Sequence, residues 1–540
     1  MSVIRSITRD LLGSLTRNII VETIASAAAA ILDSLQTESN GMVLHFESDT
    51  ALVRDTGTPA NDYNDSFNTE AADFLTYTSP SPKMVLQADG TLKFAAHNLY
   101  LNSATPATQS ITVLSGHPYK LIVTGTTSIT VSGAGTGTAT AGSPVTFTAG
   151  TTTATLTLNS GTGTAQFGFA NRVETYLETT GSARYALPIE YDSAGVSKGV
   201  LSEPAATNLV PYSKDLTLSF AENAAKTLVE GTQLSPNGVD YMWELGDNSA
   251  GGTGGPRVEF NTTTTSGNTY TFSVYAKQKQ LSWIYVFISV FTTNGGVYFD
   301  LGTGTAGTEG AGYTGKIEPV GDGIYRCSVT FTATATGSGA GCDIYLADSD
   351  GDLLVDLDGT SDIYWSDPQL EVGSTATSYI PTYGSTVTRA KDQITLATSA
   401  FPYSDTAGSI ITSVDWKILS SSNIAYSLND GTNTNRFLLY GATNDTAINS
   451  GGGLVQLNTD VFNAGADSDI HGVSVGSGSV SATANGVAVV SGSIAMPIGV
   501  TTFSIGMSRS NVQQLNGHFK YIKYLPRAIE DAELITDTTA

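Results

Sequence analysis

The chain has 540 residues, enough for about three or four domains. It carries 25 Lys and Arg against 49 Asp and Glu, and the formal charge of −24 disfavours binding to nucleic acid and insertion into or adsorption on anionic membranes. With 57 glycines and 40% hydrophobic residues, the composition indicates short strands and tight turns rather than disorder. The two cysteines, Cys327 and Cys342, are too few for a disulfide framework, and a hairpin between them would not bring them face to face.

Residues 1–40 are predicted to contain the one long helix of the chain, over 2–36. Its apolar stripe is formed by Ile4, Ile7, Leu11, Ile20, Ile24 and Ile31. Charged residues interrupt the stripe, which argues against a secretory signal. Because such a stripe would be exposed on a free helix, we expect it to anchor or oligomerise the protein: on a partner chain, on its own copies, or on its own downstream domain.

From residue 41 onward the pattern changes to period two, and strands alternate with glycine-rich turns. The sequence therefore predicts a mainly β protein, with several antiparallel β-sandwich or jelly-roll domains in series after one N-terminal α-helix. Residues 41–103 and 171–205 are assigned to a β-rich connecting region. Residues 104–170 contain five short strands separated by Gly, Thr and Ser turns, which predicts a small immunoglobulin-like sandwich insertion.

Residues 206–392 hold the clearest strands, joined by long polar connections, which is typical of a jelly roll. The strands are expected at Tyr270–Ala276, Trp283–Phe291, Val297–Leu301, Tyr325–Thr332, Cys342–Leu346 and Ile363–Trp365. Residues 393–540 form a last all-β domain, in which Asn485-Gly486 marks a two-residue hairpin turn.

Several motifs resemble those of known proteins. The central ones are Glu203-Pro-Ala-Ala-Thr-Asn-Leu, Tyr270-Thr-Phe-Ser-Val-Tyr-Ala-Lys, Tyr298-Phe-Asp-Leu-Gly-Thr-Gly, Pro368-Gln-Leu-Glu-Val-Gly and Thr377-Ser-Tyr-Ile-Pro-Thr. They look like those of a carbohydrate-binding-module-like jelly roll found in structural proteins of tailed bacteriophages. The end of the chain, from Leu515 to Leu534, resembles the last strand and helix of a laminin-G or concanavalin-like sandwich. The resemblance implies a virion structural protein, assembled in the host cytoplasm.

No residues suggest catalysis or a resident cofactor. The five histidines are scattered, and the single Gly-x-Ser-x-Gly match, Gly472 to Gly476, lacks the helix that must follow a nucleophile elbow. We therefore expect no enzymatic activity.

The stretch from Asp348 to Gly359 is the best metal candidate. Asp348, Asp350 and Asp352 could present hard oxygen ligands to calcium. The spacing departs from the helix-loop-helix calcium loop, because Leu353 stands where glycine belongs. An acidic hairpin loop is the alternative interpretation.

The strand Trp283–Phe291 is apolar on both faces. Its aliphatic face is expected to enter the core, whereas Trp283, Tyr285 and Phe287 lie on the other face. That aromatic face could stack on sugar rings, contact another chain, or pack inside its own domain. Trp243 and Trp365 are expected to extend it.

These observations predict a non-enzymatic tail fibre or spike component that binds host surface glycan. Its helix would contact other virion proteins, and the chain would form a homotrimer. The alternative is a capsid, collar or head-fibre decoration protein, since both roles need an anchor and exposed sandwiches. A polysaccharide depolymerase is a third hypothesis, but the chain lacks the repeat of a β-helix.

Overall fold

The computed structural model describes residues 41–46, 50–54, 63–65, 75–78, 81–222, 226–290, 293–419, 423–441, 446–459, 469–510 and 513–539. The predicted helix over 2–36, with its six isoleucine and leucine positions, lies outside these residues. Within them almost all regular structure is antiparallel β-sheet, so the predicted mainly β fold is confirmed. No helix in these ranges is long and apolar enough to cross a bilayer.

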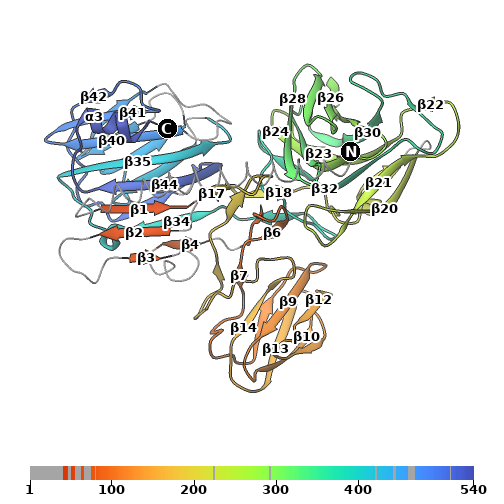
Figure 1. Ribbon diagram of the computed structural model, residues 1–540, viewed down its shortest axis with the longest axis horizontal. Helices are drawn as coiled ribbons and strands as arrows, with labels where there is room; N and C mark the ends of the chain where they lie inside the picture. The colour runs from red at the N-terminus through yellow and green to blue at the C-terminus, as the bar shows by residue number, and fades with distance from the viewer. Residues whose placement is uncertain are drawn as a thin grey trace, which may run out of the picture. The chain divides into compact units, whose positions relative to one another are not determined.

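The chain divides into two compact units. Unit 1 comprises Met1–Ser79, Ala186–Pro204 and Lys391–Ala540, and unit 2 comprises Pro80–Tyr185 and Ala205–Ala390. Each unit is described below by itself (Figure 1).

Unit 1 is a sandwich of two antiparallel sheets. One has the order β3-β2-β1-β44-β35-β40-β41-β42 with β17 and β16 also attached through β44, and the other has the order β39-β38-β37-β36-β43-β34-β4. Trp416, Phe503 and Ile522 belong to the core between them. The bounds are β1 Gly41–His45, β2 Thr50–Arg54, β3 Tyr63–Asp65, β4 Thr76–Thr78, β16 Ile189–Tyr191, β17 Ser197–Ser202, β34 Gln393–Ala397, η3 Thr398–Ala400, β35 Ala407–Trp416, β36 Ile424–Asn429, β37 Arg436–Tyr440, β38 Thr446–Ser450, β39 Gly453–Leu457, β40 Asp469–Gly476, β41 Ser479–Ala484, β42 Val490–Gly492, β43 Thr502–Ile505, β44 Gly517–Leu525 and α3 Asp531–Asp537.

Unit 1 takes its strands from three separate stretches of the chain. β1 and β17 both pair with β44, and β4 pairs with β34. These short strands were expected to form a connecting region, whereas in the structure they extend the sheets of the C-terminal sandwich. Their backbone groups need partners, but a strand of three to six residues carries no pattern that identifies its partner.

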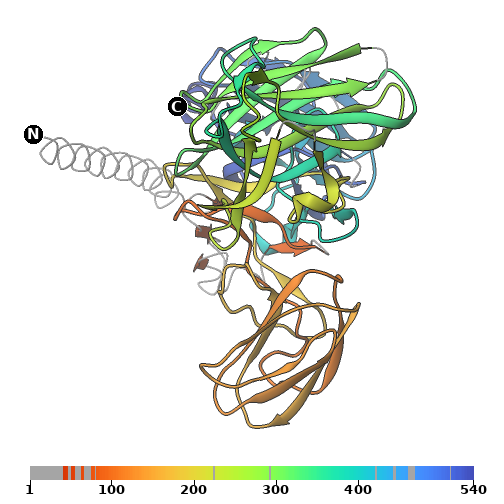
Figure 2. The same ribbon diagram turned by 90° about the vertical axis from the view of Figure 1, so that its right-hand side faces the viewer.

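Unit 2 begins with a small sandwich, drawn in orange in Figures 1 and 2. A four-stranded sheet, β11-β10-β13-β8, and a three-stranded sheet, β12-β9-β14, share a core that includes Leu121, Ile129 and Phe167. The bounds are β5 Met84–Leu86, β6 Leu92–Phe94, β7 His97–Asn98, β8 Gln109–Thr112, β9 Pro118–Val123, β10 Ser128–Gly133, β11 Gly137–Ala139, β12 Val145–Thr148, β13 Thr153–Ser160, β14 Ala165–Phe169 and β15 Arg184–Tyr185.

The remainder of unit 2 is the jelly roll. Two six-stranded sheets, β19-β23-β30-β25-β26-β27 and β20-β21-β32-β24-β29-β28, enclose a core that includes Phe272, Ile344 and Trp365. The bounds are β18 Ala206–Asn208, α2 Leu216–Ser219, β19 Ala221–Glu222, β20 Lys226–Leu234, β21 Tyr241–Asp247, β22 Thr253–Gly254, β23 Arg257–Thr264, β24 Thr269–Gln278, β25 Trp283–Val290, β26 Thr293–Asp300, β27 Thr305–Glu309, β28 Tyr313–Gly321, β29 Ile324–Thr332, β30 Gly337–Ala347, β31 Val355–Asp356, β32 Asp362–Val372 and β33 Val387–Arg389.

The two cysteines are buried free thiols in this core. Cys327 lies on β29 and Cys342 on β30, which belong to opposite sheets. The expected hairpin between them is therefore wrong, because the chain crosses from one sheet to the other. Burial raises the pKa of both thiols, which disfavours the reactive thiolate.

A buried polar cluster holds the beginning and the end of the jelly roll together. The Asn208 amide donates to the carbonyl oxygens of Pro368 (3.2 Å) and Ile380 (2.9 Å), and its oxygen accepts from the nitrogens of Val210 and Leu370. Ser213 and Thr382 exchange hydrogen bonds between backbone nitrogen and side-chain hydroxyl, at 2.9 Å in each direction. The Gln369 side-chain oxygen accepts from the Ile380 nitrogen at 2.8 Å, and the Tyr379 hydroxyl lies 2.7 Å from that of Ser213. We call Asn208, Ser213, Gln369, Tyr379 and Thr382 the closing clasp of the jelly roll. Three of the motifs that carry the resemblance, around Asn208, Gln369 and Tyr379, thus meet in one hydrogen-bonded cluster.

Candidate functional site

Strand β25 presents two different faces, as its sequence predicts. Ile284, Val286 and Ile288 are fully buried between the sheets. Trp283, Tyr285 and Phe287 point to the opposite face of the sheet and are partly exposed. The aromatic face is therefore open to a ligand along at least part of its length.

Neighbouring strands extend this face into a row of three tyrosines. Tyr285 lies in register with Tyr345 of β30 on one side and with Tyr298 of β26 on the other. The rings of Tyr285 and Tyr298 stack with centroids 4.3 Å apart, and that of Tyr345 lies 6.2 Å from Tyr285. We call Tyr345, Tyr285 and Tyr298 the aromatic row. The sequence gives no sign of the row, because it depends on the order of the strands.

Phe287 lies beside the aromatic row at one end. Its ring meets that of Tyr345 edge to face, with centroids 6.0 Å apart. Burial, with neighbouring tyrosines adding to it, raises the pKa of Tyr285 to about 12. Its hydroxyl therefore keeps its proton at neutral pH and can donate a hydrogen bond.

Charged side chains border this end of the row. The Arg257 guanidinium lies over the Tyr345 ring, 5.1 Å from its centroid. It forms ion pairs with Glu259 at 3.3 Å and Asp343 at 3.5 Å. Burial raises the pKa of Asp343 to about 7 despite the opposing charge of Arg257.

The raised pKa of Asp343 makes stability depend on pH. Between about pH 4 and pH 7 the folded protein keeps a proton on Asp343 that the unfolded chain releases, so folding becomes less favourable as the pH rises. Asparagine at position 343 carries no such proton, so the free energy of unfolding of Asp343→Asn should not fall in this way. We expect the variant to become more stable relative to the native protein by ~1–3 kcal/mol as the pH rises from 4.5 to 8. Denaturant titrations across this range measure the difference. A gap that stays constant with pH would contradict the assignment.

The acidic loop, residues 348–352, borders the other end of the aromatic face. Asp350 accepts hydrogen bonds from the backbone nitrogen (2.8 Å) and the hydroxyl (3.0 Å) of Thr308. A Cβ on Gly307 would come within 2.7 Å of the Trp283 ring and 2.6 Å of the Asp350 carboxylate. Glycine at this position thus lets Trp283 and the acidic loop pack against the same backbone.

The three aspartates of this loop do not converge on a common point. Asp352 accepts from the Leu354 nitrogen, while the Asp348 nitrogen donates to the Asp352 carbonyl oxygen in a tight turn. Among the described residues, no group of three or more His, Cys, Asp or Glu side chains is arranged to hold a metal ion. Asp348, Asp350 and Asp352 thus lie in a tight acidic turn, and calcium binding by this loop stays a prediction.

Trp243 and Trp365 do not extend the aromatic face. Both belong to the sheet opposite β25, on the adjacent strands β21 and β32. Trp365 has no exposed surface and packs edge to face on Phe220, while Trp243 is half-buried and donates to the Lys214 carbonyl oxygen. Alternation along one strand fixes a face, but it cannot say to which sheet a strand belongs.

The Gly-x-Ser-x-Gly match lies within strand β40. Ser474 is buried in the middle of this strand, and its hydroxyl donates to the Ile529 carbonyl oxygen at 3.0 Å. The sharp strand-to-helix turn of a nucleophile elbow does not form at Ser474.

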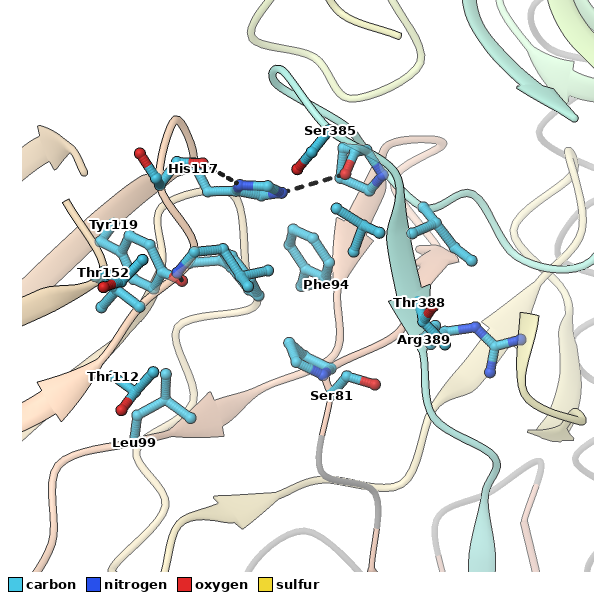
Figure 3. Close-up of a pocket in the computed structure, with 18 of the residues that line it drawn as sticks. Ser81, Phe94, Leu99, Thr112, His117, Tyr119, Thr152, Ser385, Thr388 and Arg389 are labelled. Carbon is cyan, nitrogen blue, oxygen red and sulfur yellow. Dashed lines mark hydrogen bonds between the residues drawn. The ribbon is translucent and has the colours of Figure 1, made fainter. Parts of the chain in front are cut away.

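Unit 2 also contains a cavity of about 610 Å³ that sequence reasoning missed (Figure 3). Its lining combines aromatic side chains, among them Phe94 and Tyr119, with hydroxyls such as Thr112 and Ser385. His117 also lines it, with one ring nitrogen 3.2 Å from the Ser115 carbonyl oxygen and the other 3.2 Å from that of Pro381. The lining comes from distant parts of the chain, which is why no local pattern revealed it.

The chain is similar to known proteins at low sequence identity and low TM-score. No protein-family profile matches the chain, and no curated protein matches it. Among solved structures it is similar to NanB with Optactamide (15% identity, TM-score 0.24). The match covers 26% of this chain and only 26% of that one. It is also similar to the N-terminal CBM22-1–CBM22-2 tandem of Paenibacillus barcinonensis Xyn10C (10% identity, TM-score 0.21, 57% of this chain and 96% of that one). A third is mouse laminin alpha1 LG4-5 (11% identity, TM-score 0.18, 61% of this chain and 92% of that one). At these scores the similarities decide neither family nor ligand.

Proposed function

We propose that the protein is a non-enzymatic structural component of a bacteriophage virion that binds a host surface glycan through the outer face of β30, β25 and β26. The observation that supports glycan binding is the aromatic face of this sheet, on which Trp283, Tyr285, Phe287 and Tyr345 are partly exposed, while Tyr298 is buried and stacks on Tyr285. Sugar rings carry apolar C–H faces that pack on such aromatic side chains, while their hydroxyls exchange hydrogen bonds with tyrosines and carboxylates.

The virion assignment rests on the resemblance of the motifs around residues 203–213 and 368–382 to those of tailed-phage structural proteins. The acidic charge of the chain is compatible with high local concentration in an assembled particle. The helix predicted over residues 2–36 would join the protein to other virion proteins and to two further copies of itself.

Tyr285→Ala is the direct test of the binding face. Because Tyr285 lies at the centre of the row, we expect its loss to weaken glycan binding at least about 10-fold, as for a central contact residue. Binding is measured on a host-derived glycan array and then by calorimetry with the oligosaccharide that binds best. Tyr241→Ala is the matched control, since Tyr241 is 47% exposed on the opposite sheet. Equal loss in both variants, or loss of self-association alone, would refute the sugar site.

Immunogold labelling with an antibody against residues 393–540 tests the place of the protein in the particle. We expect label at the tail end of intact virions, as for a fibre or spike. Label distributed over the capsid would replace this role by that of a head decoration protein. Shortening of host polysaccharide on incubation with the purified protein would instead support a depolymerase.

A further inference from the structure

The aromatic face is bordered by carboxylates at both ends. Glu259 and Asp343 lie beside Arg257 at one end, and Asp350 lies beside Trp283 at the other. Asp352 lies in the same tight turn as Asp350. Burial raises the pKa of Tyr298, and the charges of Asp350 and Asp352 raise it further. In the contacts described for this face, Arg257 is the one cation, and it is paired with both Glu259 and Asp343.

We propose, on the basis of the proposed function, that this face selects an uncharged glycan and rejects sugars that bear carboxylates. An anionic sugar stacked on Tyr285 would lie among the carboxylates of Glu259, Asp350 and Asp352 with a single, already paired guanidinium, and would be repelled. The same carboxylates are strong acceptors for the hydroxyls of a neutral sugar. Specificity then comes from the border of the face, and stacking comes from its centre.

The experiment compares neutral oligosaccharides with uronate-bearing oligosaccharides of equal length, using the full-length protein at 20 and 150 mM salt. We expect neutral sugars to bind at least about tenfold more tightly, with the gap narrowing at the higher salt. The double variant Asp350→Asn, Asp352→Asn should improve uronate binding severalfold and should weaken neutral binding, because the neutral sugar loses two carboxylate acceptors; the ratio of neutral to uronate binding should therefore fall. Preference for uronates, or an unchanged ratio in this variant, overturns the specificity proposal alone. Binding of no glycan at all overturns the proposed function as well.

A separate observation concerns the small sandwich, which is held together by the same contacts as the jelly roll. The stretch Ala95-Ala-His-Asn-Leu-Tyr-Leu-Asn-Ser103 corresponds to Ala205-Ala-Thr-Asn-Leu-Val-Pro-Tyr-Ser213. The Asn98 amide donates to the carbonyl oxygens of Ala165 (3.1 Å) and Leu177 (2.9 Å), and its oxygen accepts from the nitrogens of Tyr100 and Phe167. Asn208 makes the same four bonds at equivalent positions.

The other clasp residues correspond as well. Ser103 and Thr179 exchange hydrogen bonds between nitrogen and hydroxyl at 3.1 and 2.9 Å, and the Ser103 hydroxyl lies 2.8 Å from that of Tyr176. In the jelly roll, Ser213 lies 2.7 Å from the Tyr379 hydroxyl in the same way. Gln166 occupies the place of Gln369, and both amides point to a backbone carbonyl oxygen one residue before the tyrosine.

The two clasps enclose very different lengths of chain. Asn98 and its partner Ala165 are 67 residues apart, whereas Asn208 and Pro368 are 160 residues apart. Each clasped stretch also interrupts the chain of unit 1 once, between 79 and 186 and between 204 and 391. Because the same contacts close both stretches regardless of what they enclose, the clasp belongs to the base of an inserted module rather than to one particular sandwich.

We infer that residues 95–179 and 205–382 are two copies of one module type, inserted in succession into the unit 1 sandwich, and that each copy is closed independently by its own clasp. The inference gives the small sandwich the same standing as the jelly roll, as a module whose two ends are joined by its own clasp. It holds whether or not either module binds glycan.

Hydrogen exchange of the full-length chain with mass-spectrometric detection tests this. Asn98→Ala should speed exchange at least about tenfold in residues 165–179 and leave 368–382 unchanged, and Asn208→Ala should do the reverse. Ser103→Ala and Ser213→Ala are milder variants that should show the same pattern if an alanine at either asparagine prevents folding. If one substitution speeds exchange in both segments, or in neither, the inference that the two clasps act independently is overturned.

Discussion

Replacing Asn208 by alanine is expected to destabilise the jelly roll by about 4 kcal/mol. The side chain has no exposed surface and makes four hydrogen bonds, with Pro368, Ile380, Val210 and Leu370. Each net bond contributes about 1 kcal/mol, and alanine leaves four buried backbone groups without this partner. Tryptophan emission during denaturant unfolding measures the change, since three of the four tryptophans, at 243, 283 and 365, lie in this module.

Asn261→Ala is the matched control for this substitution. Asn261 is exposed on β23 of the same module, and its loss should change stability by no more than ~0.5 kcal/mol. An equally small effect of Asn208→Ala would mean that water or a shifted backbone replaces the amide, and that the clasp does not hold the module closed.

The sequence predicted well those features that depend on a single strand. The alternation along β25 correctly separated Ile284 and Val286 from Trp283 and Tyr285, and the turn at Asn485 and Gly486 has positive φ at both residues, as its hairpin requires. Each of these features is determined by neighbours within a few residues.

Features that depend on pairing between distant strands could not be predicted in this way. The aromatic row needs Tyr345 and Tyr298, which join Tyr285 only because β30 and β26 are its neighbours in the sheet. For the same reason Trp365, an apparently similar aromatic, is enclosed in the core of the jelly roll. The clasps show a further limit: the motif around Asn208 was recognised by resemblance, but its partners 160 and 172 residues away were invisible without the fold.

Lys214→Met is expected to destabilise the jelly roll by ~3–5 kcal/mol, because it leaves a buried carboxylate without its charge partner. The Lys214 ammonium lies 2.6 Å from Asp367 and 3.0 Å from Asp240, and 5.6 Å from the centroid of the clasp residue Tyr379. Asp367 is 3% exposed, and its carboxylate also accepts a hydrogen bond from the Ser366 hydroxyl at 2.8 Å. Although burial opposes it, the charge of Asp367 raises the pKa of Lys214 above its usual range.

Because the pKa of Lys214 is raised, the stability lost in Lys214→Met is expected to be independent of pH in the neutral range. A lysine with a raised pKa contributes its full stabilisation below the unfolded value of about 10.4 and loses it only as the pH rises through the higher folded value. Denaturant titrations at pH 6 and pH 9 should therefore give the same difference between Lys214→Met and the native protein. Lys277→Met is the control: its ion pair with Asp322 is exposed and should cost no more than ~1 kcal/mol. The double variant Lys214→Met with Asp367→Asn should recover part of the stability lost in Lys214→Met alone. If it recovers none, the loss comes from the packing of the lysine stem, and the buried ion pair does not join β32 to the clasp.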